Sequence, residues 1–150
     1  MPIRAVRVCA RTWEPLRTSG RPNRWNASGQ HVLYLSEHFG TAVLETVVNA
    51  ATTAPPPAHA TWVTIGDDIN VVEYTATDLP DGWDDPDDQS VARAIGAAWV
   101  AAGATACLVV PSVPGRPYER NIVVNTRHRD FRKLVWEPAK LVPWDPRLFA

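Results

Sequence analysis

The sequence contains little cysteine. Cys9 and Cys107 are its two cysteines among 150 residues, and each lies in an apolar run. There is no CxxC pair and no group of histidines and cysteines at the spacing of zinc ligands. These absences argue against a disulfide scaffold and against a structural metal site. We expect two reduced, buried thiols and a cytoplasmic protein.

Long apolar runs and an excess of charge are also missing. No stretch approaches the roughly 20 apolar residues of a membrane span, and the N-terminus lacks the apolar run of a signal peptide. The 15 basic and 16 acidic residues give a net charge of -1. A chain this close to neutral is not built as a whole to bind nucleic acid or an anionic membrane. We therefore expect no membrane partner and no direct contact with DNA.

The frequent enzyme signatures are absent as well. The sequence contains no GxxxxGK[ST] or GxGxxG phosphate loop, no GxSxG nucleophile elbow, no HExxH zinc motif and no calcium loop. A catalytic site in this chain would have to be built from other residues.

What the sequence does contain is typical of one globular domain. Apolar residues make up 45% and charged residues 21% of the chain, a composition that suits a packed core rather than disorder. The length is that of one ordinary domain, so we expect a single domain over residues 1–150. Seven tryptophans and 14 prolines predict a loop-rich domain with large, rigid anchors in its core or in a cleft.

The hydrophobic pattern predicts several strands. Alternation or short apolar runs favour strands over residues 3–9, 31–36, 62–65, 69–75, 106–112, 120–125 and 132–138. A turn at residues 66–68 joins the third and fourth of these strands. Residues 52–60 are rich in proline and predict a stiff, extended connector.

Two segments carry a helical pattern. The first runs from Glu37 to Ala50, with Ser36 as the expected N-cap. The second covers residues 89–103, is capped by Asp87 or Asp88, and stops at Gly103. Its expected buried stripe consists of Val91, Ile95, Ala98, Trp99 and Ala102.

Charge is unevenly distributed along the chain. Residues 1–24 carry six arginines against one glutamate, and residues 116–133 carry five arginines and a lysine against two acidic residues. Residues 78–88 carry six aspartates and predict a solvated loop. If the two basic segments converge, they form a cleft that attracts anionic ligands. We expect Arg24 as its inner contact and one or two of Arg17, Arg21, Arg116 and Arg120 at its rim.

Two segments resemble the motifs of a known family. Arg24-Trp25-Asn26 is followed by the strand-like run 32–36 and by Glu45, so that Arg24 and Tyr34 are ten residues apart and Tyr34 and Glu45 eleven. Later, Pro111-Ser112 follows an apolar run, and Glu119, Asn121 and the segment NTRHRDF (125–131) come after it. The pattern resembles the RES domain family, the toxin half of many bacterial toxin–antitoxin operons. Pro22-Asn23 replaces the glycine pair of the family pattern, and Thr126 and Arg129 stand where the family often has proline.

The resemblance implies a fold and a substrate. RES proteins are similar in fold to ADP-ribosyltransferases, which implies a compact α+β domain with a split, mostly antiparallel sheet and flanking helices. It also implies that NAD is consumed as a substrate, with no bound cofactor or metal, by cleavage of the nicotinamide–ribose bond. The family partner is an Xre-type helix-turn-helix antitoxin that covers the active site, and DNA would be contacted only through it.

The resemblance also implies roles for particular residues. Arg24 would hold the diphosphate and the nearby ribose, because a guanidinium binds diphosphate oxygens bidentately. Tyr34 would stack on nicotinamide, and Glu45 would contact the nicotinamide ribose and offset its oxocarbenium-like charge. Ser112 would order that ribose, or the attacking phosphate or water. Asn26 would either bind the ligand or stabilise its turn.

Other residues receive supporting interpretations. Glu119 and Asn121 are candidates for bracing the cleft, and His128 for packing its loop. Trp25 would anchor its loop in the core or line the adenine pocket. Trp136 and Trp144 are expected to pack the C-terminal segment onto the body of the domain.

Alternative readings stay open at this point. A binding module could hold a nucleotide or single-stranded nucleic acid without chemistry, and a degenerate family member could serve only to bind a partner. The sequence does not separate phosphorolysis, hydrolysis and ADP-ribosyl transfer, since all three use the same groups on the substrate side. It also leaves a homodimer open.

Overall fold

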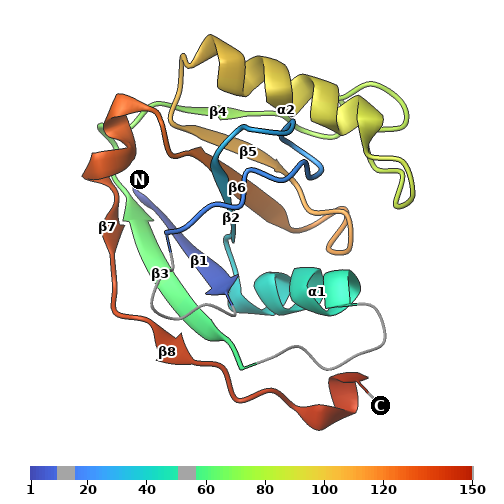
Figure 1. The fold of residues 1–150 in the computed structure, drawn as a ribbon, viewed down its shortest axis with the longest axis vertical. Coiled ribbons are helices and arrows are strands. Elements are labelled where there is room, and N and C mark those ends of the chain that lie inside the picture. The colour runs from blue at the N-terminus through green and yellow to red at the C-terminus, as the bar shows by residue number, and fades with distance from the viewer. Residues whose placement is uncertain (10–15, 51–56, 150) are drawn as a thin grey trace.

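The structure is a computed structural model that describes residues 1–9, 16–50 and 57–149. Within these ranges it has the predicted α+β fold, with two α-helices, two 3-10 helices and one eight-stranded sheet (Figure 1). The elements are β1 (Ile3–Cys9), β2 (Val32–Ser36), α1 (Phe39–Ala50), β3 (His59–Ile65), β4 (Val71–Glu73), α2 (Ser90–Ala102), β5 (Cys107–Pro111), β6 (Arg120–Asn125), η1 (Arg129–Lys133), β7 (Val135–Trp136), β8 (Lys140–Leu141) and η2 (Pro146–Phe149). Residues 52–56 of the predicted connector lie outside the described residues.

The sheet consists of two halves that are joined at one point. Its strand order is β4-β5-β6-β2-β1-β3-β7, with β8 also paired to β3. β1 pairs with β3 along seven residues and β2 with β6 along five, whereas β1 and β2 are joined by the single pair Val6 and Ser36. The expected split, mostly antiparallel sheet is therefore confirmed, and the split lies between β1 and β2.

Most predicted strands are present, but their partners could not be read from the sequence. The turn after β3 forms, with the Ile69 amide donating to the Gly66 carbonyl. The strands on either side of it do not pair, since β3 lies beside β1 and β4 lies beside β5. β4 and β5 are parallel, and α2 forms the connection between them. The other strand pairs are antiparallel.

The start of α1 and part of the buried face of α2 differ from the prediction. α1 begins at Phe39, so Ser36 is not its N-cap; Ser36 ends β2 and is buried there. α2 stops at Gly103 as predicted, where that residue adopts the left-handed conformation. Of the expected buried stripe, Trp99 is buried and Val91 and Ile95 are partly buried against the core, whereas Ala98 and Ala102 are exposed. Ala92 and Gly96 complete the buried face. Neither helix in the described ranges has the length and hydropathy of a membrane span.

Three apolar clusters cover the two faces of the sheet. One face carries a continuous cluster that spans both halves and includes Ala5, Leu33 and Ile122. On the other face, one cluster packs α2 and the Trp25 loop onto β5 and β6, and another packs α1 and the C-terminal segment onto β1 and β3. Trp136 packs against the first cluster and Trp144 against the third, which confirms both as anchors.

The two cysteines differ in exposure. Cys107 is fully buried, and this burial raises the pKa of its thiol to about 12. Cys9 is half-buried at the end of β1. The prediction of two buried thiols is therefore confirmed only for Cys107.

α2 packs directly on the backbone of the loop that carries Arg24. A Cβ atom placed on Gly96 would lie 1.9 Å from the Trp25 carbonyl oxygen, which is closer than any real contact. The Trp25 ring is buried beside Trp83, with ring centroids 6.3 Å apart. α2 can therefore approach the Trp25 backbone this closely only because residue 96 has no side chain.

We predict that Gly96→Ala lowers the free energy of unfolding by roughly 1–3 kcal/mol, because the added methyl overpacks the helix against the loop. Gly40→Ala in α1 is the matched control, since a Cβ there meets nothing within 4 Å and alanine is a better helix former than glycine. Urea unfolding of both variants measures the difference. Equal stabilities would contradict the close approach of α2 to the Trp25 backbone.

Candidate active site

The loop that carries Arg24 is tied to β2 by hydrogen bonds. The Asn26 side chain is buried, and its amide nitrogen donates to the carbonyls of Arg21, Ala27 and Gln30. The Tyr34 hydroxyl donates to Asn26 Oδ1 at 2.6 Å and accepts from the Trp25 amide at 3.1 Å. These contacts match the turn-stabilising alternative for Asn26, and its contact with a ligand stays a prediction.

The Tyr34 hydroxyl therefore forms hydrogen bonds with two residues of the loop, and Tyr34 also lines a cavity. Burial raises the pKa of its phenol well above the ordinary value. The phenol stays protonated and can donate to Asn26 at any physiological pH.

Arg24 points into the same cavity and is held by the aspartate-rich loop. Its guanidinium donates to the carbonyl oxygens of Trp83 at 2.9 Å and Asp85 at 3.0 Å. Burial lowers the pKa of Arg24, while the charges of Glu45 and Asp84 act in the opposite direction. An arginine stays cationic at neutral pH under such a shift, so the cavity contains a fixed positive charge.

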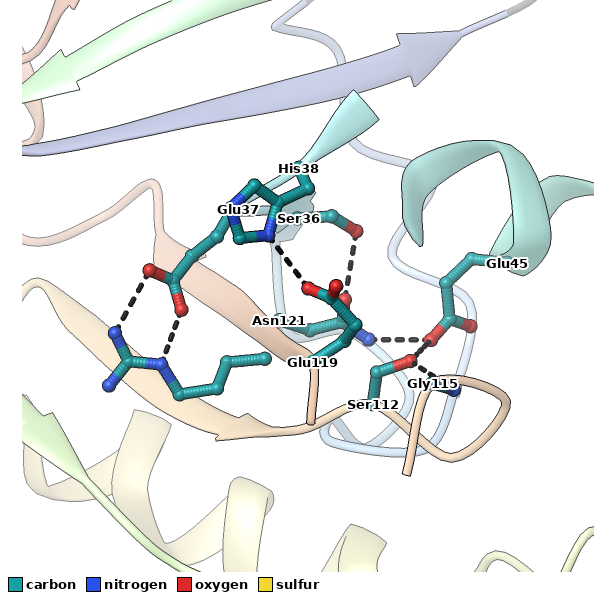
Figure 2. A network of polar contacts seen from close by, with 9 residues as sticks. Ser36, Glu37, His38, Glu45, Ser112, Gly115, Glu119 and Asn121 are labelled. Atoms are coloured by element: carbon teal, nitrogen blue, oxygen red, sulfur yellow. Dashed lines mark hydrogen bonds and ion pairs between the residues drawn. The ribbon is translucent and has the colours of Figure 1, made fainter. Parts of the chain in front are cut away.

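Glu45 lies on the inner face of α1, opposite the ends of β5 and β6. Its Oε1 accepts hydrogen bonds from Ser112 Oγ at 2.8 Å and from Asn121 Nδ2 at 2.6 Å (Figure 2). Two donors from separate strand ends fix the carboxylate and balance part of the cost of removing it from water.

Ser112 is hydrogen-bonded to Glu45 but does not line the cavity. It is fully buried, and its hydroxyl accepts from the Gly115 amide at 3.1 Å while donating to Glu45. The cavity lining includes its neighbours Pro111 and Val113 but not Ser112 itself. The contact of this hydroxyl with ribose, phosphate or water stays a prediction, and its observed contact is with the carboxylate.

One cavity joins these residues. It has a volume of about 340 Å³, at the low end of the ~300–1,000 Å³ range of ligand pockets. The cavity is lined by both halves of the sheet, by α1, by the loop that carries Arg24 and by the aspartate-rich loop before α2. Its lining residues include Val6, Arg24, Trp25, Tyr34, Ser36, Ala42, Glu45, Asn49, Pro86, Gln89 and Asn121. The structure thus brings Arg24, Tyr34 and Glu45 to one cavity, and Ser112 is hydrogen-bonded to Glu45 outside the lining.

None of the arginines expected at the rim is among the residues that line the cavity. Arg120 is paired with Glu37 and, at 2.6 Å, with Glu73, and these carboxylates raise the pKa of its guanidinium. Arg116 is paired with Asp84 of the aspartate-rich loop. Neither residue lines the cavity, and nor do Arg17 and Arg21. Arg116 and Arg120 form ion pairs with nearby carboxylates. Among the described residues, Arg24 is the one arginine that lines the cavity.

The structure shows what the supporting residues contact and adds two that the sequence did not single out, Asn49 and Gln89. Asn121 was a candidate for bracing the cleft, and its bond to Glu45 shows how it can do so. Asn49 lies four residues after Glu45 in α1 and lines the same cavity, which helical spacing could have indicated. Gln89 lines it from the start of α2, and no sequence signal pointed to it. His128 caps η1, as its expected packing role requires.

We predict that Tyr34→Phe lowers the free energy of unfolding by about 1–3 kcal/mol, because it leaves the buried Asn26 oxygen and the Trp25 amide without their partner. Tyr118→Phe is the control, since that ring is 88% exposed. Denaturant unfolding of both variants tests the prediction. A Tyr34→Phe protein as stable as the control would show that the hydroxyl does not hold the loop.

Comparison with known proteins identifies the family of the chain. Residues 4–145 match the family model described as RES domain. The chain is 27% identical to Toxin Res of Yersinia enterocolitica serotype O:8 / biotype 1B over 143 residues, 95% of this chain and 93% of that protein. It is 31% identical to the Prs ADP-ribosylating toxin of Sphingobium sp. (strain YBL2) over 147 residues, 93% of this chain and 91% of that protein. Toxin Res of Photorhabdus laumondii subsp. laumondii is 29% identical over 115 residues, 75% of this chain and 71% of that protein. Because the family model and these relatives extend over most of the sequence, the chain belongs to the RES domain family.

Proposed function

We propose that this protein is a toxin that consumes NAD by breaking the bond between nicotinamide and ribose. The observation that carries the proposal is the cavity that joins Arg24, Tyr34 and Glu45, with the Glu45 carboxylate held by two donors. The names of the Yersinia and Sphingobium relatives, a toxin and an ADP-ribosylating toxin, support it. ADP-ribosylation uses the ADP-ribose part of NAD and releases nicotinamide.

Glu45 supplies the charge that the reaction needs. Nicotinamide is already cationic in NAD and leaves as a neutral molecule, so the site needs no strong general acid. The ribose left behind develops oxocarbenium-like positive charge, as in glycoside hydrolysis. A carboxylate fixed in advance stabilises that charge without reorganising during the reaction. Ser112 and Asn121 provide this fixation.

Arg24 would bind the diphosphate. Its hydrogen-bond partners in the structure are neutral backbone carbonyls, so its charge is available to an anion. The ring of Tyr34 would stack on nicotinamide, while its hydroxyl holds the Arg24 loop in position. A substrate bound to Arg24 at one end and to Glu45 at the other would have its scissile bond oriented between fixed groups.

The acceptor of ADP-ribose distinguishes three versions of the reaction. The bond that breaks is the same in each, and the ribose carbon then bonds to inorganic phosphate, to water or to a group on a macromolecule. The name of the Sphingobium relative favours transfer to a macromolecule as a second candidate beside phosphorolysis and hydrolysis. The products formed with and without phosphate, and with and without bacterial lysate, would identify the version.

The partners follow from the family. We propose that an Xre-type helix-turn-helix antitoxin covers the cavity and neutralises the toxin in the cytoplasm, and that DNA is contacted only through this antitoxin. Homodimer formation is part of the same proposal, and co-purification with the antitoxin tests both assemblies.

We predict that Glu45→Gln reduces NAD consumption about 10²–10³-fold, because it removes the negative charge that stabilises the oxocarbenium-like ribose. Chromatographic measurement of NAD and nicotinamide, with and without phosphate, checks this. Glu137→Gln is the control, since that carboxylate pairs with Arg4 on the surface away from the cavity. Full consumption by a folded Glu45→Gln protein would contradict the role of Glu45. Release of no nicotinamide by the parent protein with any acceptor would contradict the proposed function itself.

We predict that Arg24→Lys lowers kcat/KM for NAD at least about 10-fold, equal to about 1.4 kcal/mol, because an ammonium keeps the charge but loses the planar fork. Arg4→Lys is the matched control, since Arg4 is exposed and its partners are Glu137 and the Trp62 ring. Initial rates over a range of NAD concentrations measure both variants. Equal kcat/KM values would mean that Arg24 does not bind the diphosphate.

A further inference from the structure

Ser36 is the first member of a hydrogen-bonded chain that ends at Glu45. Ser36 and Asn121 face each other in the register of β2 and β6, and the Ser36 hydroxyl donates to Asn121 Oδ1 at 2.8 Å. Asn121 Nδ2 in turn donates to Glu45 Oε1 at 2.6 Å (Figure 2). All three residues line the cavity, and Ser36 is only 4% exposed.

The direction of this chain is fixed by the chemistry of its members. A side-chain amide has an acceptor oxygen and a donor nitrogen. If the Asn121 amide turned over, its oxygen would face the Glu45 carboxylate, and two acceptors would meet without a proton between them. By donating to Oδ1, the Ser36 hydroxyl stabilises the one orientation in which Asn121 donates to Glu45.

The second donor to Glu45 is oriented in the same way. The Gly115 amide can only donate, and it occupies an acceptor site of the Ser112 hydroxyl. The single hydroxyl proton of Ser112 is therefore free to point at Glu45 Oε1. Among the described residues, no side chain donates to the other oxygen, Oε2. The carboxylate is thus held through one oxygen, and the other is left to a ligand.

Neighbouring pairs hold the backbone that follows Ser36. Beyond the end of β2, Glu37 pairs with Arg120 and His38 with Glu119, and the Glu37 amide donates to the Arg120 carbonyl at 3.3 Å. Glu37 and His38 thus face Arg120 and Glu119 in the same antiparallel order as the residue pairs of β2 and β6. Loss of the Ser36 hydroxyl would therefore disturb the Asn121 amide while the strands stay paired.

We infer that Ser36 is a positioning residue that sets the Glu45 carboxylate through the Asn121 amide. The inference rests on the proposed function, in which Glu45 stabilises the ribose in the transition state. Ser36 acts on the rate of the chemical step and not on substrate binding.

A double-mutant cycle of Ser36→Ala and Asn121→Ala tests this role, with kcat and KM for NAD measured for each variant. We expect Ser36→Ala to lower kcat about 5–10-fold, the effect of one hydrogen bond, with KM nearly unchanged. In the Asn121→Ala background, Ser36→Ala should lower kcat less than about twofold further, because the two act as one unit. Thr105→Val is the control, since the Thr105 hydroxyl bridges Trp99 Nε1 and the Cys107 carbonyl outside the cavity; it should lower the unfolding temperature and leave kcat unchanged.

A second measurement does not depend on turnover. The side-chain amide signals of Asn121 in an NMR spectrum, identified by their loss in Asn121→Ala, should shift in both Ser36→Ala and Glu45→Gln and stay in place in Thr105→Val. Unshifted signals in Ser36→Ala, an unchanged kcat, or effects that multiply in the double variant would each overturn the inference. If the parent protein does not turn over NAD at all, the proposed function fails, and the NMR signals still show whether the hydrogen-bonded chain exists.

Discussion

The architecture depends on a single point of pairing between β1 and β2. At Val6 and Ser36 the two halves of the sheet are joined, and elsewhere these neighbouring strands do not pair. One face still packs as a continuous core across both halves, which keeps the halves in a fixed relation. On the other face the apolar side chains form two separate clusters. The cavity takes lining residues from both of these clusters, so it lies where the pairing of the sheet is incomplete.

A carboxylate placed at such a junction has structural consequences of its own. A charged group that is partly removed from water needs hydrogen-bond partners, and Glu45 finds them in Ser112 and Asn121 at the ends of β5 and β6. α1 packs with the β1 half of the sheet, while these donors belong to the other half. The contacts that hold the carboxylate therefore also tie the two halves together across the cavity.

Local sequence patterns predicted the elements well and their neighbours poorly. Alternation indicated β1, and a glycine at position 103 marked the end of α2, because these features depend on nearby residues alone. The resemblance to the RES domain family implied a shared site for Arg24, Tyr34 and Glu45, and all three line one cavity. The role of Ser36 could not be read in this way, since its partner lies 85 residues away and is set by the register of β2 and β6. Long-range pairing decides such contacts, and a single sequence does not show it.

The arginines show why composition alone misplaced the positive charge. Arg116 and Arg120 lie in a basic stretch of the sequence, yet each forms an ion pair with carboxylates from distant segments. Their fields largely cancel against those partners at short range. Arg24 is bonded instead to two backbone carbonyls, which orient the guanidinium without neutralising it. The aspartate-rich loop thus supplies carboxylates that neutralise one arginine and carbonyls that position another. This difference, rather than the number of arginines, leaves Arg24 as the arginine at which the proposed function places an anionic substrate.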